Sequence, residues 1–190
     1  MARRCRAVGG RAWTDVMVRG MHLAPLVALD GRRLEVVVDG LPFYAGAQLA
    51  VDATLVSALR RDGTPRPHAA YEGGIALTYA RGKKARTYPE LSGANRRARL
   101  VVVAGGIGGR WSEETVHFLI QLAKARVRTE PRRAQGQVAR AWLYKWLAVL
   151  ACAAGKEFTS FLLDKRAGLG RGSDLSFSHE VSTGARLVLM

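Results

Sequence analysis

Two acidic residues, Glu35 and Asp52, each interrupt an otherwise apolar stretch of the chain. Glu35 lies within RLEVVV, residues 33–38, and Asp52 lies within QLAVDATLVS, residues 48–57. Both stretches have the composition of strands, and consecutive strands of one meander would bring the two carboxylates side by side. Adjacent buried carboxylates repel one another and lose hydration. A bound cation offsets both of these free-energy costs. Oxygen ligands of this kind suit Mg²⁺ or Mn²⁺, so we expect Glu35 and Asp52 to bind such a metal.

A metal in that position suggests phosphoryl chemistry. It would polarise a phosphoryl oxygen and lower the pKa of an attacking water, and a nearby ammonium group would neutralise the charge of the transition state. Lys83 or Lys84, on the next expected helix, could supply that group. Simpler interpretations stay open, because an acid in an edge strand can face solvent and the cluster of Lys83, Lys84 and Arg86 can be a solvated helix face.

The remaining motifs indicate no other chemistry. The segment GGIGG, residues 105–109, lies between an expected strand and an expected helix, where phosphates can bind. It matches neither GxGxxG nor a P-loop, so a tight strand-to-helix turn is the favoured interpretation. The four histidines are scattered, and Cys5 and Cys152 form no CxxC motif. This spacing excludes a structural zinc site and a disulfide framework.

The elements that must position the two acids begin with a predicted three-stranded meander. Asp30-Gly31 separates a short apolar run, residues 26–29, from the strand 33–38, and this dipeptide between β-prone runs is a strong hairpin signal. The strand 48–57 completes the meander. Residues 1–22 have no clear period, and we assign them no element.

A helix, a strand and a second helix are expected after the meander. The first helix covers 72–88 and ends before Pro89, and a short buried strand follows over 99–104. The next helix should have Ser112 as its N-cap, with acidic residues in its first turn. We expect its apolar face to comprise Val116, Leu119, Ile120, Ala123 and Val127.

This order predicts a mixed α+β fold with a C-terminal helical extension. A long helix over 137–165 is apolar on most sides around 146–154, so we expect it to be buried. We divide the chain into an unassigned segment (1–23), a core (24–130), a helical extension (131–167) and a flexible tail (168–190).

The charge of the chain favours a polyanionic partner. The 190 residues carry a formal net charge of +15, from 30 Lys and Arg against 15 Asp and Glu, and the excess is spread along the whole length. Such a balance is typical of proteins that bind nucleic acid or an anionic surface, although a GC-rich coding sequence produces the same excess of arginine. The longest apolar run, 146–155, is shorter than a membrane span. We therefore expect an intracellular protein that does not bind a membrane.

Residues 31–128 resemble the restriction-like endonuclease domain in the C-terminal part of non-LTR (LINE-type) retrotransposon polyproteins, a branch of the PD-(D/E)XK nuclease superfamily. The resemblance rests on an ordered set: the acid of RLEVVV, a hairpin, AVDATLVS, the K-x-x-x-Y pair Lys84 and Tyr88, the VVV strand and GGRWSEE opening a helix. Three features differ from the family pattern. Leu34 replaces a proline, Glu35 replaces an aspartate, and Gly106 stands where many relatives have a glutamate.

The resemblance implies a restriction-endonuclease-like core that nicks DNA with Mg²⁺ (or Mn²⁺), in the nucleus and without a small-molecule cofactor. Glu35 and Asp52 would be the metal ligands, Lys84 would orient water or stabilise charge, and Tyr88 would support Lys84 or contact the nucleic acid. Phosphate contacts are expected from six basic residues: Arg60, Arg61, Lys83, Arg86, Lys124 and Arg128.

The alternative is a catalytically inactive nucleic-acid-binding remnant of such an element, which the three departures and the lack of a polymerase motif favour. A third interpretation is a folded protein whose basicity reflects coding bias alone. The choice between DNA and RNA, the cleavage sequence and the oligomeric state stay open.

Overall fold

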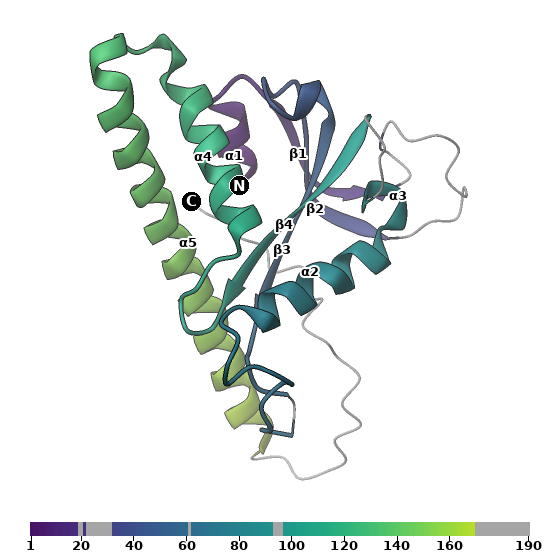
Figure 1. Cartoon of the computed structure of the whole chain (residues 1–190). Coiled ribbons are helices and arrows are strands. Elements are labelled where there is room, and N and C mark those ends of the chain that lie inside the picture. Colours follow the sequence, from purple (N-terminus) through teal and green to yellow (C-terminus); the bar gives the residue numbers. More distant parts are fainter. Residues whose placement is uncertain (19–20, 22–31, 61, 93–96, 170–190) are drawn as a thin grey trace.

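Four strands form one mixed sheet in the computed structural model of the chain (Figure 1). They are β1 (Arg11–Met17), β2 (Arg33–Asp39), β3 (Gln48–Val56) and β4 (Ala98–Gly106), and they lie in the sheet in this order. The pairs β1–β2 and β2–β3 are antiparallel, whereas β3–β4 is parallel. The parallel pair requires a crossover, and the helical segment between the two strands provides it. The mixed α+β class is therefore confirmed.

The structure describes residues 1–18, 21, 32–60, 62–92 and 97–169. The predicted strand over 26–29 lies outside this part of the chain, as does the predicted flexible tail (168–190) beyond residue 169, whereas 168–169 belong to a helix. The first strand of the antiparallel meander is instead β1, in the segment to which no element was assigned. Only Ala12 of β1 is buried, so this edge strand lacks the alternation by which strands are recognised.

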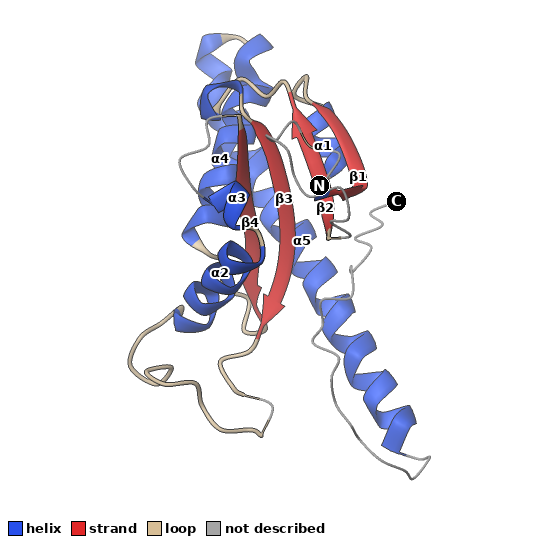
Figure 2. Ribbon diagram, turned by 90° about the vertical axis from the view of Figure 1, so that its right-hand side faces the viewer, coloured by secondary structure: helices blue, strands red, loops and turns tan. Residues whose placement is uncertain are grey.

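Two helices lie on one face of the sheet, α2 (Ile75–Thr87) and α3 (Pro89–Ser92) (Figure 2). The predicted helix over 72–88 is present but begins at Ile75, because Gly74 adopts a left-handed conformation with φ of 99° just before it. Pro89 ends α2 as predicted and then opens α3, since proline is well accommodated in the first turn of a helix.

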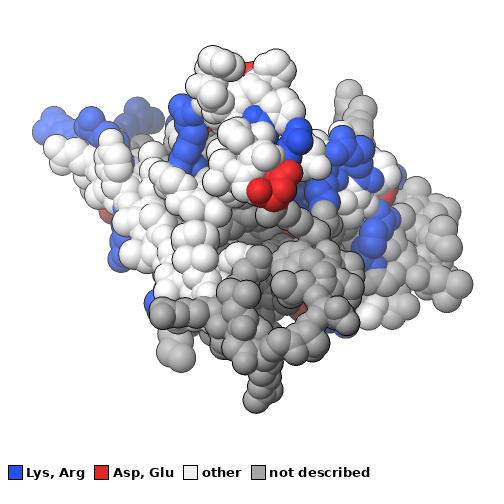
Figure 3. All heavy atoms as spheres, turned by 90° about the horizontal axis from the view of Figure 1, so that it is seen from below, with Lys and Arg blue, Asp and Glu red and all other residues white. Residues whose placement is uncertain are grey.

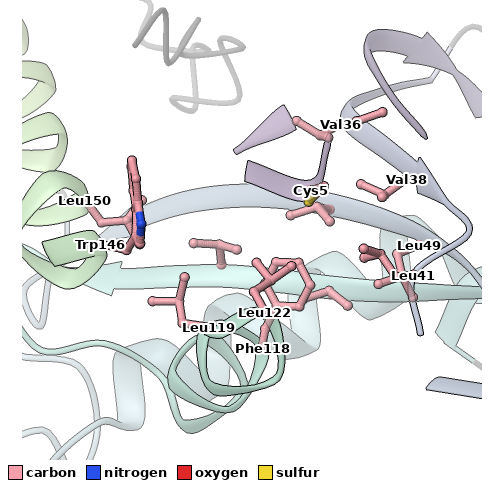
Figure 4. Packing of buried hydrophobic residues seen from close by; sticks show 14 residues of the cluster. Cys5, Val36, Val38, Leu41, Leu49, Phe118, Leu119, Leu122, Trp146 and Leu150 are labelled. Atoms are coloured by element: carbon pink, nitrogen blue, oxygen red, sulfur yellow. The ribbon is translucent and has the colours of Figure 1, made fainter. Parts of the chain in front are cut away.

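The other face of the sheet is covered by α1 (Ala2–Arg6), α4 (Glu113–Arg126) and α5 (Arg132–Leu169). Figure 4 shows how their side chains meet those of the sheet in one apolar cluster. Ser112 caps α4 as predicted, because its Oγ accepts a hydrogen bond from the amide of Thr115 at 3.2 Å. Short 3₁₀ turns at Tyr44–Gly46 and Val127–Thr129 complete the described elements.

The buried face of α4 differs from the predicted one. Leu119, Ala123 and Val127 are buried as expected, but Val116 and Ile120 are only half-buried. The face is centred instead on Thr115, Phe118, Leu119 and Leu122. Because α4 packs against both the sheet and α5, its buried surface is wider than a single apolar stripe. The helical period of apolar residues therefore placed the centre of the buried face wrongly.

The helix α5 is longer and less buried than predicted. It covers 132–169 rather than 137–165, and Trp146 and Leu150 anchor it to the core. Beyond them the expectation of burial is wrong, since Ala151 and Cys152 are exposed and the helix continues past the lower end of the sheet (Figure 1). The span Arg132–Leu163 is long and apolar enough to cross a membrane by length and composition, with 11% of its apolar window buried. Those criteria alone are weak evidence, so the absence of membrane binding stays a prediction.

Candidate active site

Glu35 and Asp52 occupy neighbouring positions on β2 and β3. The last ladder pair that joins these strands is Val36 with Val51, and the two acids are the next residues along each strand. Glu35 is half-buried and Asp52 is 4% exposed. The structure thus brings together the two acids that the sequence pattern singled out.

The strand β2 is irregular at Glu35. Leu34 packs in the apolar cluster under α2, whereas Val36 packs in the cluster under α4. Residues two apart in a regular strand point to the same face, so the alternation is interrupted between them. The Glu35 carboxylate accepts a hydrogen bond from the amide of Ala53 at 3.2 Å. This bond takes the place of a ladder bond at the point where the regular pairing stops.

Lys84 completes the cluster from above the sheet. Its Nζ lies 2.8 Å from Asp52 Oδ2, and the exposed fractions of the two side chains are 18% and 5%. Lys84 reaches the sheet because it shares the inner face of α2 with Leu77, Ala80 and Tyr88, which are all buried. The expected helical lysine therefore contacts one of the two expected acids.

Burial and mutual repulsion perturb the two carboxyl groups. Burial, followed by the charge of Asp52, raises the pKa of Glu35 from 4.5 to about 7. Burial also raises the pKa of Asp52, while the Lys84 ammonium lowers it. The pair carries less negative charge near neutral pH than two exposed acids would, because both desolvation and repulsion favour protonation.

Tyr88 holds α2 to the start of β2. Its side chain is 6% exposed, and its hydroxyl donates a hydrogen bond to the carbonyl oxygen of Arg33 at 2.8 Å. The guanidinium of Arg32 lies 5.5 Å from the ring centroid. Since Tyr88 follows Lys84 by one helical turn, these contacts fix the end of α2 that carries Lys84. Tyr88 thus ties the C-terminal end of α2 to the start of β2.

The two carboxylates fit a divalent cation of the magnesium type. Mg²⁺ usually binds one or two carboxylates and keeps several waters. Burial and then repulsion by Asp52 raise the pKa of Glu35, and a bound cation would offset both. Among the described residues no cluster of three or more His, Cys, Asp or Glu side chains forms a fuller site. Glu35 and Asp52 are accordingly the side chains that would hold such an ion.

The six expected phosphate-binding residues do not form one surface. Lys83 lies on α2, where it is half-buried, and Arg86 is exposed on the same helix; Arg60 is exposed on the loop after β3. Lys124 and Arg128 lie at the C-terminal end of α4, at the opposite end of the sheet from that loop (Figure 1). Arg61 lies outside the described residues.

The glycine-rich segment forms a tight turn, the interpretation favoured from sequence. The amide of Gly106 donates to the carbonyl of Arg110 at 2.7 Å, and the amide of Gly109 donates to Gly106 at 2.8 Å. The amide of Ile107 donates to Val56 at 3.0 Å. These donors are satisfied within the protein, so the turn offers no row of amides to a phosphate.

Two polar clusters have no counterpart in the sequence analysis. Arg81 on α2 pairs with Glu114 at the start of α4 at 2.8 Å, which joins helices on opposite faces of the sheet around its β4 edge. The guanidinium of Arg66 lies 4.5 Å from the ring centroid of the half-exposed Tyr79. Neither pair has a diagnostic spacing, so only the tertiary structure reveals them.

Comparison with known proteins adds no assignment to this geometry. No family model matches the chain, and neither curated proteins nor solved structures include a significant match.

Proposed function

We propose that the chain is a metal-dependent endonuclease that nicks DNA, of the restriction-endonuclease-like kind found in non-LTR retrotransposon polyproteins. The observation that carries the proposal is the cluster of two adjacent strand carboxylates with the Lys84 ammonium 2.8 Å from Asp52. The element order also supports it: a meander, α2, the parallel strand β4 and α4 follow one another as that family resemblance implies.

The roles of the residues follow from their surroundings. Glu35 and Asp52 would hold Mg²⁺ or Mn²⁺, and a bound cation would supply Lewis-acid activation of water and of the phosphodiester. Lys84 favours the ionised form of Asp52 and places a positive charge where a phosphate would approach. Tyr88 keeps Lys84 in position through its hydrogen bond to Arg33. The net charge of +15 supports a nucleic-acid partner.

A second candidate is a nucleic-acid-binding protein that no longer cleaves. One observation favours it: the Glu35 carboxylate already accepts a hydrogen bond from Ala53, and Asp52 is already neutralised by Lys84. Both acids therefore have a structural role that needs no metal. The two candidates differ in whether the cluster also binds a cation and cleaves.

Plasmid nicking decides between them. Supercoiled DNA would be incubated with the protein in Mg²⁺, in Mn²⁺ and in EDTA, beside the variants Asp52→Asn and Asp39→Asn. Asp39 is the matched control, because it is an acid on β2 that lies away from the carboxylate cluster. Its carboxylate forms an ion pair with Arg11, with a nitrogen-to-oxygen distance of 3.2 Å. We expect metal-dependent nicking that falls on the order of 100-fold in Asp52→Asn and is unchanged in Asp39→Asn.

Two results would contradict the nuclease assignment. Nicking that persists in Asp52→Asn would come from another site or a contaminant. DNA binding without any metal-dependent nicking by the wild-type protein would establish the second candidate instead.

A further inference from the structure

Half-buried Arg66 and half-exposed Tyr79 form a stacked pair on the side of α2 that faces away from the sheet. The guanidinium carbon of Arg66 lies 4.5 Å from the ring centroid of Tyr79, and Tyr79 is 51% exposed. The pair lies outside the carboxylate cluster, because Tyr79 and Lys84 point in different directions from the helix. No role in the proposed cleavage accounts for it.

The arginine is held firmly in this position. Its Nε donates to the carbonyl oxygen of Ser57 at 3.1 Å, and its backbone amide donates to Ala58 at 2.9 Å. A β-bridge between Leu59 and Pro65 closes the same loop. The planar guanidinium is therefore pre-organised against the tyrosine ring, so little conformational entropy is lost when a ligand binds there.

The surroundings of the pair are basic. Lys83 and Arg86 follow Tyr79 at spacings of four and seven residues, which places all three on one face of α2. Between residues 57 and 88, Lys and Arg outnumber Asp and Glu seven to two. Two of the seven, Arg81 and Lys84, pair with Glu114 and Asp52 from outside this segment. Figure 3 shows Lys and Arg side chains on the right of the view from below, and others on its left.

We propose that Tyr79 and Arg66 form a stacking site for an unpaired base of a single-stranded nucleic acid, whose phosphates contact Lys83 and Arg86. An aromatic ring beside a guanidinium plane presents the π surface on which unpaired bases stack, whereas the bases of a duplex are already stacked on one another. The neighbouring cations neutralise the backbone of the same strand. This site binds whether or not the carboxylate cluster cleaves.

Fluorescence anisotropy with a labelled 20-nucleotide single strand, and with the same sequence as a duplex, tests the proposal. Three variants are compared with the wild-type protein: Tyr79→Ala, Tyr79→Phe and Tyr144→Ala. Tyr144 is the matched control, because it is 68% exposed on α5. We expect Tyr79→Ala to weaken single-strand binding about 10-fold, because one base loses the ring on which it stacks. Tyr79→Phe retains the ring and should bind like the wild-type protein.

The proposal is overturned if Tyr79→Ala binds the single strand normally, if it weakens duplex binding equally, or if the wild-type protein binds no single strand at low salt. A melting curve of each variant excludes misfolding as the cause, and Tyr79→Phe does so independently. Plasmid nicking separates this proposal from the proposed function, because Asp52→Asn should lose nicking but keep single-strand binding.

Discussion

At the scale of single residues, the surroundings of Glu35 act on the ionisation of its carboxyl group in opposite directions. Its carboxylate accepts a hydrogen bond from Ala53 where the β2–β3 ladder ends, which favours the ionised form. Burial and the neighbouring Asp52 favour the protonated form and raise its pKa to about 7. An uncharged isostere would keep the hydrogen bond without the cost of a buried charge.

This conflict predicts how stability depends on pH. In the unfolded chain Glu35 ionises near its ordinary value of 4.5, whereas in the folded protein its pKa is about 7. Between these values the folded state holds a proton that the unfolded state has released, so the contribution of Glu35 to stability falls as pH rises through this range. Glu35→Gln removes this titration. Its free energy of unfolding, relative to wild type, should increase by about 2 kcal/mol from pH 5 to pH 8.

Urea unfolding in EDTA at several pH values measures this difference. Added Mg²⁺ should stabilise the wild-type protein above pH 7 and have little effect on Glu35→Gln, because only the ionised pair binds a cation well. A difference between the two proteins that is the same at pH 5 and pH 8 would show that the titration of Glu35 is not coupled to folding.

At the scale of elements, the turn between β4 and α4 depends on particular glycines. A Cβ atom on Gly105 would lie 2.6 Å from the ring of Trp111, whereas one on Gly108 would meet nothing within 4 Å. Gly109 has a φ of 84°, a conformation that other residues rarely adopt. The turn therefore needs Gly105 for space and Gly109 for its backbone, and it tolerates a side chain at Gly108.

The substitutions Gly105→Ala and Gly108→Ala are a matched pair. Gly105→Ala displaces Trp111 and should destabilise the protein by about 1–3 kcal/mol. Gly108→Ala should change stability by about 0.5 kcal/mol or less. Thermal and urea unfolding measure both, and equal stability of the two variants would contradict the close packing of Trp111 on Gly105.

At the scale of the whole molecule, the distribution of charge matters more than its total. The net charge is +15, but the expected phosphate contacts divide between two faces of the sheet. Lys83 and Arg86 lie on α2, while Lys124 and Arg128 lie at the far end of α4. A single short nucleic acid would contact only one of these two groups of basic residues. The stacked pair of Arg66 and Tyr79 lies beside α2, which favours the group on α2.

Salt titration of DNA binding distinguishes the two groups. About four phosphate contacts predict an affinity loss of about 100-fold between 50 and 200 mM salt. Arg86→Ala should reduce the slope of log affinity against log salt by about 1, whereas Arg128→Ala should leave it unchanged. Absence of binding at low salt would leave coding bias as the explanation of the charge.

Local patterns determined much of the core. The strands 33–38, 48–57 and 99–104 have strong apolar or β-branched composition, and their counterparts β2, β3 and β4 lie at nearly these positions. The N-cap at Ser112 and the end of α2 before Pro89 were predictable, because each residue affects only the backbone next to it in the sequence. The proximity of Glu35 to Asp52 was predictable because consecutive strands joined by a short connection usually pair.

Only the tertiary structure decided the features that depend on contacts between distant segments. The edge strand β1 buries one residue and has no pattern of its own, so its place follows from pairing with β2. The far half of α5 resembles a core helix in composition but extends beyond the sheet, because burial requires a partner and not only apolar residues. Which lysine reaches Asp52, and which tyrosine stacks on Arg66, follow from the rotation of α2 on the sheet. The spacing of apolar residues along α2 limits this rotation, but the packing of the helix against the sheet determines it.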